Sequence, residues 1–329
     1  MTTIDPRISP PLIRRIYKAN LVAQAAIVVT GAVVRITGSG LGCPTWPQCV
    51  EGSYVPTSRQ VESELHKYIE FGNRLLTFVL AALAIAAVVA AIIDARRRSR
   101  NGLPRRRSLT VLATIPLIGT IIQAVLGGIT VLTQLNPVTV SAHFLVSMVL
   151  IAACVFLVAR SGDPVDSPTT WLVPPPVRLL GWLVIAVTSV VVVLGVIVTG
   201  SGPHSGDAEV EARFSFDPRT VAWLHADSVL LMLGLLIGFA IAVRVTTSPK
   251  KLNRRINILL VVVLIQGFVG YLQYFTGLPE LLVSIHVLGA VLVWTAALFV
   301  LPAMGIKGGE LDQERVNSHE QEDHGQVGN

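Results

Sequence analysis

The stretch VSAHFLVSMVLIAACVFLVA, residues 140–159, contains no charged side chain over its entire length. A helix needs about 20 such residues to cross the hydrocarbon core of a bilayer. Comparable apolar runs lie, with their flanks, at residues 19–34, 75–93, 109–133, 179–199, 228–243, 256–277 and 281–305. The sequence therefore predicts an all-α integral membrane protein with eight transmembrane helices.

The overall composition agrees with this fold class. Of the 329 residues, 52% are hydrophobic and only 14% are charged, whereas soluble domains carry about 25% charged residues. The first apolar run follows Lys18 and lacks a cleavage-site pattern before the loop at Gly38. We therefore interpret it as a retained spanning helix rather than as a signal peptide.

The basic residues indicate how the chain is oriented in the membrane. They concentrate before the first span and in the second and sixth loops, at Arg7, Arg14, Arg15, Lys18, Arg96, Arg97, Arg98, Arg100, Arg105, Arg106, Arg107, Arg244, Lys250, Lys251, Arg254 and Arg255. The positive-inside rule then places both termini on the cytoplasmic side of the plasma membrane. Arginine runs beside spanning helices are typical of contact with anionic lipid headgroups, so the high pI does not indicate binding to nucleic acid.

The chain contains an internal duplication. Thr37-Gly38-Ser39-Gly40 recurs as residues 199–202, and four further residues recur 143 positions later: Gln123, Gly127, Thr133 and His143 match Gln266, Gly270, Thr276 and His286. Such parallel repeats place equivalent residues at the same depth in two similar bundles. We predict two pseudo-symmetric four-helix halves, residues 1–160 and 178–305.

Two other segments complete the predicted domain organisation. Residues 161–177 form a Pro-rich cytoplasmic linker, and its three consecutive prolines at 174–176 are expected to be non-helical. The acidic tail, residues 306–329, has too few apolar residues to pack and is expected to be disordered on the cytoplasmic side.

Four histidines lie at or just inside the start of every second span: His66, His143, His225 and His286. Ionisable residues inside spans usually mark function. Two imidazoles at one depth in a four-helix bundle suit ligation of a haem iron between them. A histidine hydrogen-bonded across helices is the alternative. A simple metal site is less expected, because no Asp, Glu or Cys in the spans is spaced to complete the coordination.

The first outer loop and the helix after it carry further candidates. Cys43 and Cys49 face the oxidising side and could form a disulfide, for which spacing alone favours a structural role. Glu70 shares a helix face with His66 and Asn73, but its counterpart in the second half is an alanine. This difference points to chemistry in the first half and cofactor binding in the second. An interfacial ion pair of Glu70 with Arg74 or Lys67 is the alternative.

Three motifs together give the chain a family resemblance over residues 15–305. They are GSGLGCPTWPQC at 38–49, IEFGNR at 69–74, and the AHF and IHV contexts of His143 and His286. With them the chain resembles the haem A synthases. The resemblance implies an oxidoreductase of cytochrome oxidase assembly that converts the C8 methyl of haem O to the formyl of haem A by successive hydroxylations with oxygen from water.

The resemblance also implies site roles. His225 and His286 would bind a haem b, His143 would bind the substrate haem O, Glu70 would be the essential carboxylate, and Cys43 and Cys49 would be the cysteine pair of the outer loop. The chain departs from the family at Asn73, where a histidine is usual. Either His66, about 10 Å away along a straight helix, replaces that ligand, or His143 binds the substrate haem alone.

The partners implied are haem O, a haem O synthase, an electron acceptor of unknown identity, the lipid bilayer and a second copy of the chain, without nucleic acid. One rival function is a di-haem cytochrome b that passes electrons from a quinol, which leaves Glu70 and the cysteine loop without a role. Another is a transporter, which predicts broken helices at the bilayer midplane.

Overall fold

The computed structural model describes residues 8–58, 63–204, 206–207 and 212–308. Within these ranges eight helices are long and apolar enough to cross a membrane, so the predicted all-α membrane fold is confirmed. The helices are α1 (Pro11–Ile36), α2 (Glu64–Arg100), α3 (Arg107–Leu132), α4 (Pro137–Arg160), α5 (Pro175–Ser201), α6 (Pro218–Thr246), α7 (Lys250–Phe275) and α8 (Glu280–Val300).

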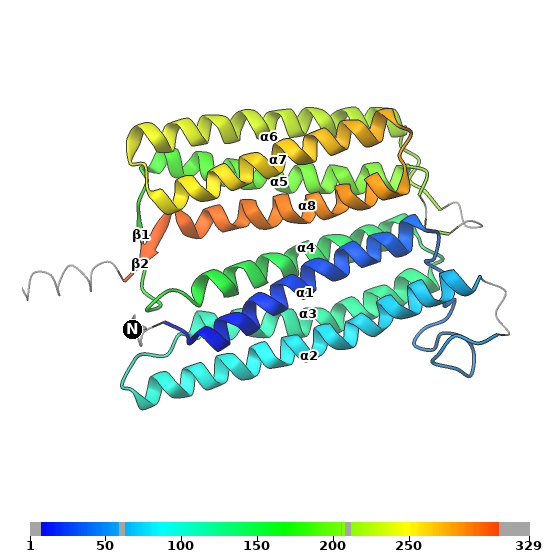
Figure 1. The fold of residues 1–329 in the computed structure, drawn as a ribbon, viewed down its shortest axis with the longest axis horizontal. Coiled ribbons are helices and arrows are strands. Elements are labelled where there is room, and N and C mark those ends of the chain that lie inside the picture. Colours follow the sequence, from blue (N-terminus) through cyan, green and yellow to red (C-terminus); the bar gives the residue numbers. More distant parts are fainter. Residues whose placement is uncertain (1–7, 59–62, 205, 208–211, 309–329) are drawn as a thin grey trace, which may run out of the picture.

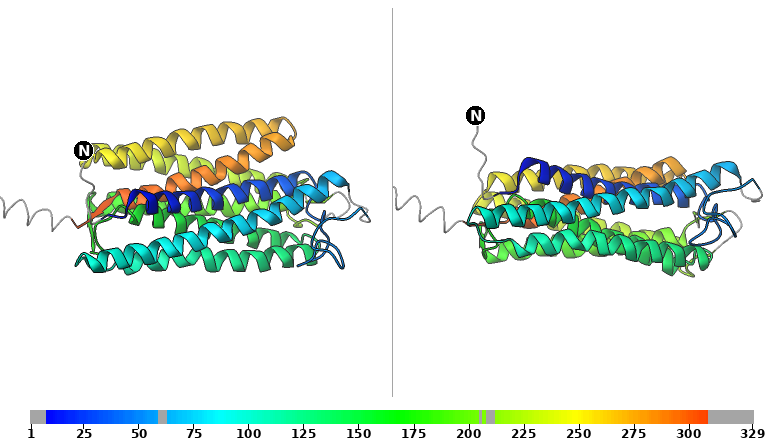
Figure 2. Two further views of the ribbon diagram at one scale, coloured as in Figure 1. Left: turned by 60° about the horizontal axis from the view of Figure 1, so that its bottom comes forward. Right: turned by 90° about the horizontal axis from the view of Figure 1, so that it is seen from below.

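The helices form two groups of four that lie side by side, with all eight helices running in roughly the same direction (Figures 1 and 2). In the first group α1 packs on α2 and α4, and α3 packs on α2 and α4; α5 to α8 repeat this arrangement in the second. Helix α8 also packs on α1 and α4. There the indole Nε1 of Trp294 donates a hydrogen bond to the Met148 carbonyl, at 2.9 Å. The two groups therefore meet along α8.

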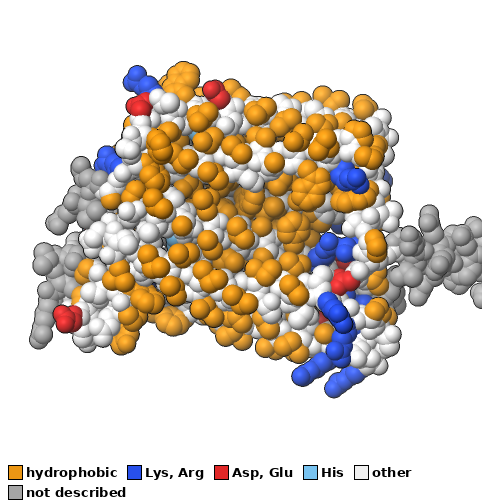
Figure 3. Space-filling model, turned by 180° about the vertical axis from the view of Figure 1, so that it is seen from behind, with side chains coloured by type: hydrophobic (Ala, Val, Ile, Leu, Met, Phe, Trp, Pro, Cys, Tyr) orange, Lys and Arg blue, Asp and Glu red, His pale blue; other side chains and the backbone are white. Residues whose placement is uncertain are grey.

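The lateral surface is suited to lipid. Hydrophobic side chains cover the middle of the face drawn in Figure 3, and most of the basic side chains lie towards one end. Large apolar residues such as Phe78 and Phe268 are 73% and 68% exposed. Continuous apolar surface of this extent marks membrane contact.

A small sheet ties the linker to the chain after α8. Strand β1 (Thr169–Trp171) pairs antiparallel with β2 (Gly305–Lys307), so that Thr170 faces Ile306. The predicted disordered tail therefore begins later than residue 306. The remainder of that prediction falls on residues 309–329, outside the described residues.

The expectation that all three linker prolines are non-helical is wrong for Pro175 and Pro176. They are the first two residues of α5, and Pro174 precedes it as the N-cap. Proline is tolerated there because the first N–H groups of a helix have no partner within the helix.

Two arginines of the inner loop are buried rather than lipid-facing. The Arg106 guanidinium contacts the Asp94 carboxylate at 2.5 Å, and both side chains are at most 2% exposed. Arg98, which is 1% exposed, donates hydrogen bonds to the carbonyls of Pro104 and Pro164, at 2.8 and 2.9 Å. These arginines therefore join the α2–α3 loop to the linker.

Candidate functional site

Three of the four candidate histidines share one packing arrangement. Each half-buried ring lies against a glycine of the preceding helix, where a Cβ atom would come within 3.1–3.4 Å of the imidazole Cε1. Glycine leaves room for the ring that any larger residue would reduce. The pairs are His143 with Gly127, His225 with Gly195, and His286 with Gly270.

Two glutamines, one from each repeat, donate hydrogen bonds to the backbone carbonyls of two of these histidines. Gln123 Nε2 donates to the His143 carbonyl at 2.9 Å, and Gln266 Nε2 donates to the His286 carbonyl at 2.8 Å. Gly289 leaves space for Gln266, whose Oε1 would lie 1.8 Å from a Cβ there. The residues matched in the sequence repeat thus make the same contact in both bundles.

The ring nitrogens of the three histidines are left largely free. His225 Nδ1 lies 3.1 Å from the Val191 carbonyl, while the buried Nδ1 atoms of His143 and His286 have no partner among the described residues. Within those same ranges, no hydrogen bond reaches Nε2 of any of the three rings. The second bundle therefore presents two imidazoles, one from α6 and one from α8.

His66 is placed differently from the other three histidines. It lies in the first turn of α2, where its backbone N–H donates to Ser63 Oγ at 3.3 Å. Its carbonyl lies 2.4 Å from where a Cβ of Gly42 would be. His66 therefore packs with its backbone against the outer loop, whereas the other three lie about two turns inside their helices.

Asn73 resembles His225 in how it meets the preceding helix. Its Oδ1 accepts a 2.8 Å hydrogen bond from Thr30 Oγ1 of α1, much as the His225 ring meets Val191 of α5. The first bundle therefore has the amide of Asn73 on the face of α2 that corresponds to the face of α6 carrying the His225 imidazole.

The predicted disulfide between Cys43 and Cys49 is present, and both cysteines are fully buried. Between them, the Trp46 ring lies on Gly128 of α3, where a Cβ would come within 2.4 Å of Cδ2. Gly128 is the neighbour of Gly127, which contacts His143. The disulfide loop thus packs on the helix pair that carries His143.

Glu70 and Arg74 connect α2 to this loop. The Glu70 carboxylate, 7% exposed, contacts Arg74 Nη2 at 2.6 Å and accepts the Cys43 backbone N–H at 2.6 Å. Arg74 also donates to three loop carbonyls, those of Cys43, Thr45 and Gln48. The ion pair with Arg74 considered as an alternative from the sequence is therefore formed, and it anchors the carboxylate beside the disulfide. Lys67 pairs with Glu64.

The two repeated outer loops contact each other, which the sequence did not indicate. The Gly40 N–H donates to the Gly206 carbonyl at 2.8 Å, and Arg35 Nε donates to the His204 carbonyl at 2.9 Å. Burial lowers the pKa of the His204 imidazole, which lies in the loop after α5. These loops thus join the two bundles through a backbone hydrogen bond and through the Arg35 side chain.

Fold and site together define a multi-pass membrane protein with two similar helix bundles, in which histidines of α4, α6 and α8 lie against glycines of the preceding helices. A model of the cytochrome oxidase assembly protein family (COX15-CtaA) matches residues 14–298. The chain belongs to this family.

Several relatives share part of the sequence. The chain is 33% identical over 117 residues to the "Heme A synthase" of Geobacillus kaustophilus. This match covers 36% of the present chain and 32% of the relative. It is 28% identical over 146 residues to that of Geobacillus thermodenitrificans, and 31% identical over 139 residues to that of Listeria welshimeri. Each of these two matches covers 42% of the relative. The matched segments thus span well under half the length of these relatives.

Proposed function

We propose that this protein is a haem A synthase that oxidises the C8 methyl of haem O to a formyl group by successive hydroxylations. The observation that carries the proposal is that the two bundles are similar in structure but carry different residues at their candidate sites. The second bundle offers two imidazoles and has Ala222 at the position of Glu70, whereas the first offers His143 together with Glu70 and a disulfide loop. Family membership and the names of the relatives support the same function.

In the second bundle, His225 and His286 would bind a resident haem b. The residues fit this group, because neither Nε2 has a protein partner within the described residues and glycines flank both rings. A haem held by these two residues would supply one-electron redox chemistry. The protein contributes the positions of the rings, which Gln266 and the Val191 carbonyl help to fix.

In the first bundle, His143 would bind the iron of the substrate haem O. Asn73 occupies the α2 face from which a second imidazole would come, so this site has one histidine ligand at that depth. His66 could replace it only if the first turn of α2 unwound, because its backbone is held by Ser63 and the outer loop. A substrate must leave after conversion, and a single strong ligand favours that release.

Glu70 is the proposed catalytic carboxylate. Each hydroxylation replaces one C–H bond of the methyl group by a C–OH bond and releases two electrons and two protons, one proton from the C–H bond and one from the water. An electron acceptor of unknown identity must take the electrons, and the doubly hydroxylated carbon loses water to give the formyl group. A carboxylate near the methyl group would stabilise positive charge that develops there or orient the attacking water. Arg74 and the Cys43 N–H hold Glu70 in one position for this task.

The other proposed properties concern partners and placement. A haem O synthase would supply the substrate, and a second copy of the chain is a further proposed partner. The basic loops support a plasma-membrane protein with cytoplasmic termini, which reporter fusions to either end would test. The comparisons lend no support to the rival quinol-oxidising cytochrome b, because the relatives reported above carry the synthase name.

Expression in a host that makes haem O but no haem A tests the function. Haem extracted from the membranes and separated by chromatography should contain haem A only when the chain is present. Accumulation of unconverted haem O alongside well-expressed, protohaem-containing protein would overturn the proposal.

A further inference from the structure

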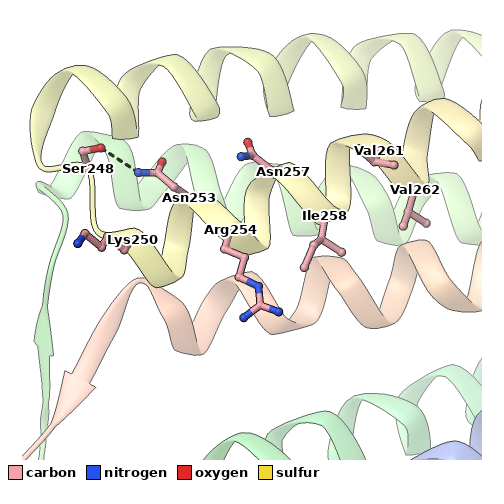
Figure 4. Close-up of a pocket in the computed structure, with 8 residues that line it drawn as sticks. All are labelled: Ser248, Lys250, Asn253, Arg254, Asn257, Ile258, Val261 and Val262. Atoms are coloured by element: carbon pink, nitrogen blue, oxygen red, sulfur yellow. Dashed lines mark hydrogen bonds between the residues drawn. The ribbon is translucent and has the colours of Figure 1, made fainter.

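A groove of about 760 Å³ lies along the cytoplasmic half of α7, distant from the histidine sites. Figure 4 shows its lining residues, which follow the start of α7 from the α6–α7 connection inward. The lining changes character along the helix: Ser248, Lys250, Asn253, Arg254 and Asn257 come first, and Ile258, Val261 and Val262 follow.

The polar end of the groove is cationic. Lys250 and Arg254 are both exposed, and neither forms an ion pair with a carboxylate in the described part of the chain. Arg244 donates to Asn257 Oδ1 at 2.7 Å, which brings a third cation to the same end. The amino-terminal end of α7 adds its own partial positive charge. The polar end therefore attracts an anion.

The inner end of the groove is apolar and faces the depth of the lipid chains. Lys250, Arg254, Ile258 and Val261 are spaced so that they follow one face of α7. From Lys250 to Val262 this stripe is roughly 18 Å long, enough for a headgroup phosphate followed by the upper part of an acyl chain. Val261 is 55% exposed along this stripe.

We propose that this groove binds an anionic phospholipid, with its phosphate at Lys250 and Arg254 and an acyl chain along Ile258, Val261 and Val262. The order of charge and hydrophobicity matches the order of a phospholipid from headgroup to tail, and basic recesses between spanning helices on the cytoplasmic side are suited to anionic headgroups. The acidic residues 310–323 of the same chain could supply the charge, but their sequence is too poor in apolar residues to occupy the inner end.

Native mass spectrometry of the full-length protein in detergent, titrated with phosphatidylglycerol or phosphatidylcholine, tests this site. The paired change Lys250→Gln and Arg254→Gln should weaken phosphatidylglycerol binding by about 30-fold. The matched control, Lys251→Gln with Arg100→Gln, removes the same charge from exposed positions outside the groove and should change the affinity little. Equal weakening in both variants, or none in either, would overturn the proposal.

Two further experiments distinguish other occupants of the groove. Val261→Trp keeps every charge but fills the apolar end, so it should weaken phosphatidylglycerol binding. If millimolar inorganic phosphate displaced the lipid fully and Val261→Trp had no effect, the groove would be a site for free anions and the lipid proposal would be refuted. Neutralising Glu310, Asp312 and Glu314 to glutamine should leave lipid binding unchanged. Binding that appears only after this neutralisation would identify the tail as the occupant and refute the proposal.

Discussion

Glu70 is an acidic side chain whose carboxylate contacts both its own helix and the outer loop. One oxygen accepts the Cys43 N–H and the other accepts Arg74. The equivalent site in the second bundle has Ala222 in place of an acid. An acid that is present in only one of two similar sites is expected to take part in the reaction that is specific to that site. In our proposal this reaction is the oxidation of the substrate methyl group.

The change Glu70→Gln should lower haem A formation by about 100-fold or more, because it removes the charge while keeping the size of the side chain. Haem b in the second bundle should remain, since Glu70 belongs to α2 of the first bundle. The haem A to protohaem ratio in membranes of the haem O host measures both effects at once.

Arg74→Lys is the control for that variant. It keeps a cation beside the Glu70 carboxylate, but a single ammonium group cannot replace all the hydrogen bonds that Arg74 makes to the loop carbonyls. An equal loss of haem A in both variants would mean that Glu70 acts by holding the loop, and the catalytic role would then have to be given up.

At the scale of helix pairs, His143, His225 and His286 each lie against a glycine of the preceding helix. A Cβ at residue 270 would lie 3.1 Å from His286 Cε1, which is tighter than normal packing allows. The glycine therefore controls where the imidazole nitrogen points, although it cannot itself bind anything.

Gly270→Val should displace the His286 ring and reduce bound haem b severalfold. Gly267→Val is the matched control, because it lies on the same helix where a Cβ meets nothing within 4 Å. The reduced low-spin band in the visible spectrum, normalised to protein, gives the haem b content. Equal content in both variants would contradict the role of Gly270.

The disulfide is tested by thiol labelling. In protein purified without reductant, Cys43 and Cys49 should resist alkylation until reduced, because they are bonded. Cys154, which is buried and free, should react only after unfolding and needs no reduction. Mass-spectrometric mapping separates the three sites, and alkylation of Cys43 in unreduced native protein would be the contrary result.

The whole molecule is held together at both ends. Loop contacts join the bundles at the end that carries the disulfide, while Arg98 and Arg106 donate hydrogen bonds to the linker at the opposite end. Asp94 makes the inner contact possible, because it pairs with the otherwise uncompensated charge of buried Arg106.

Asp94→Asn should destabilise the protein by about 3–5 kcal/mol, because breaking a buried ion pair leaves one charge without compensation. Asp163→Asn removes a partly exposed pair with Arg160 and should cost about 0–1 kcal/mol. Thermal unfolding of the purified variants compares them. Unfolding midpoints that fall equally in the two variants would argue against a special role for the inner cluster.

Features of the fold that depend on local composition could be predicted from the sequence. The lengths of the apolar runs predict the eight helices. The oxidising side of the membrane, together with the spacing of Cys43 and Cys49, indicates the disulfide. The burial of Arg98 could not be predicted, because its partner carbonyl at Pro164 lies 66 residues further along the chain. The depth of His66 was also missed, since it depends on Ser63 capping α2 only three residues earlier. The repeat located Gln123 and Gln266, but not the backbone carbonyls they contact.

The central claim is that the two bundles have different tasks, and the haem composition of purified single variants tests it most directly. With a haem O source present, His286→Ala and His225→Ala should each lose protohaem. His143→Ala should keep protohaem but lack both haem O and haem A. Loss of the same haem in all three variants, or of none, would contradict the account.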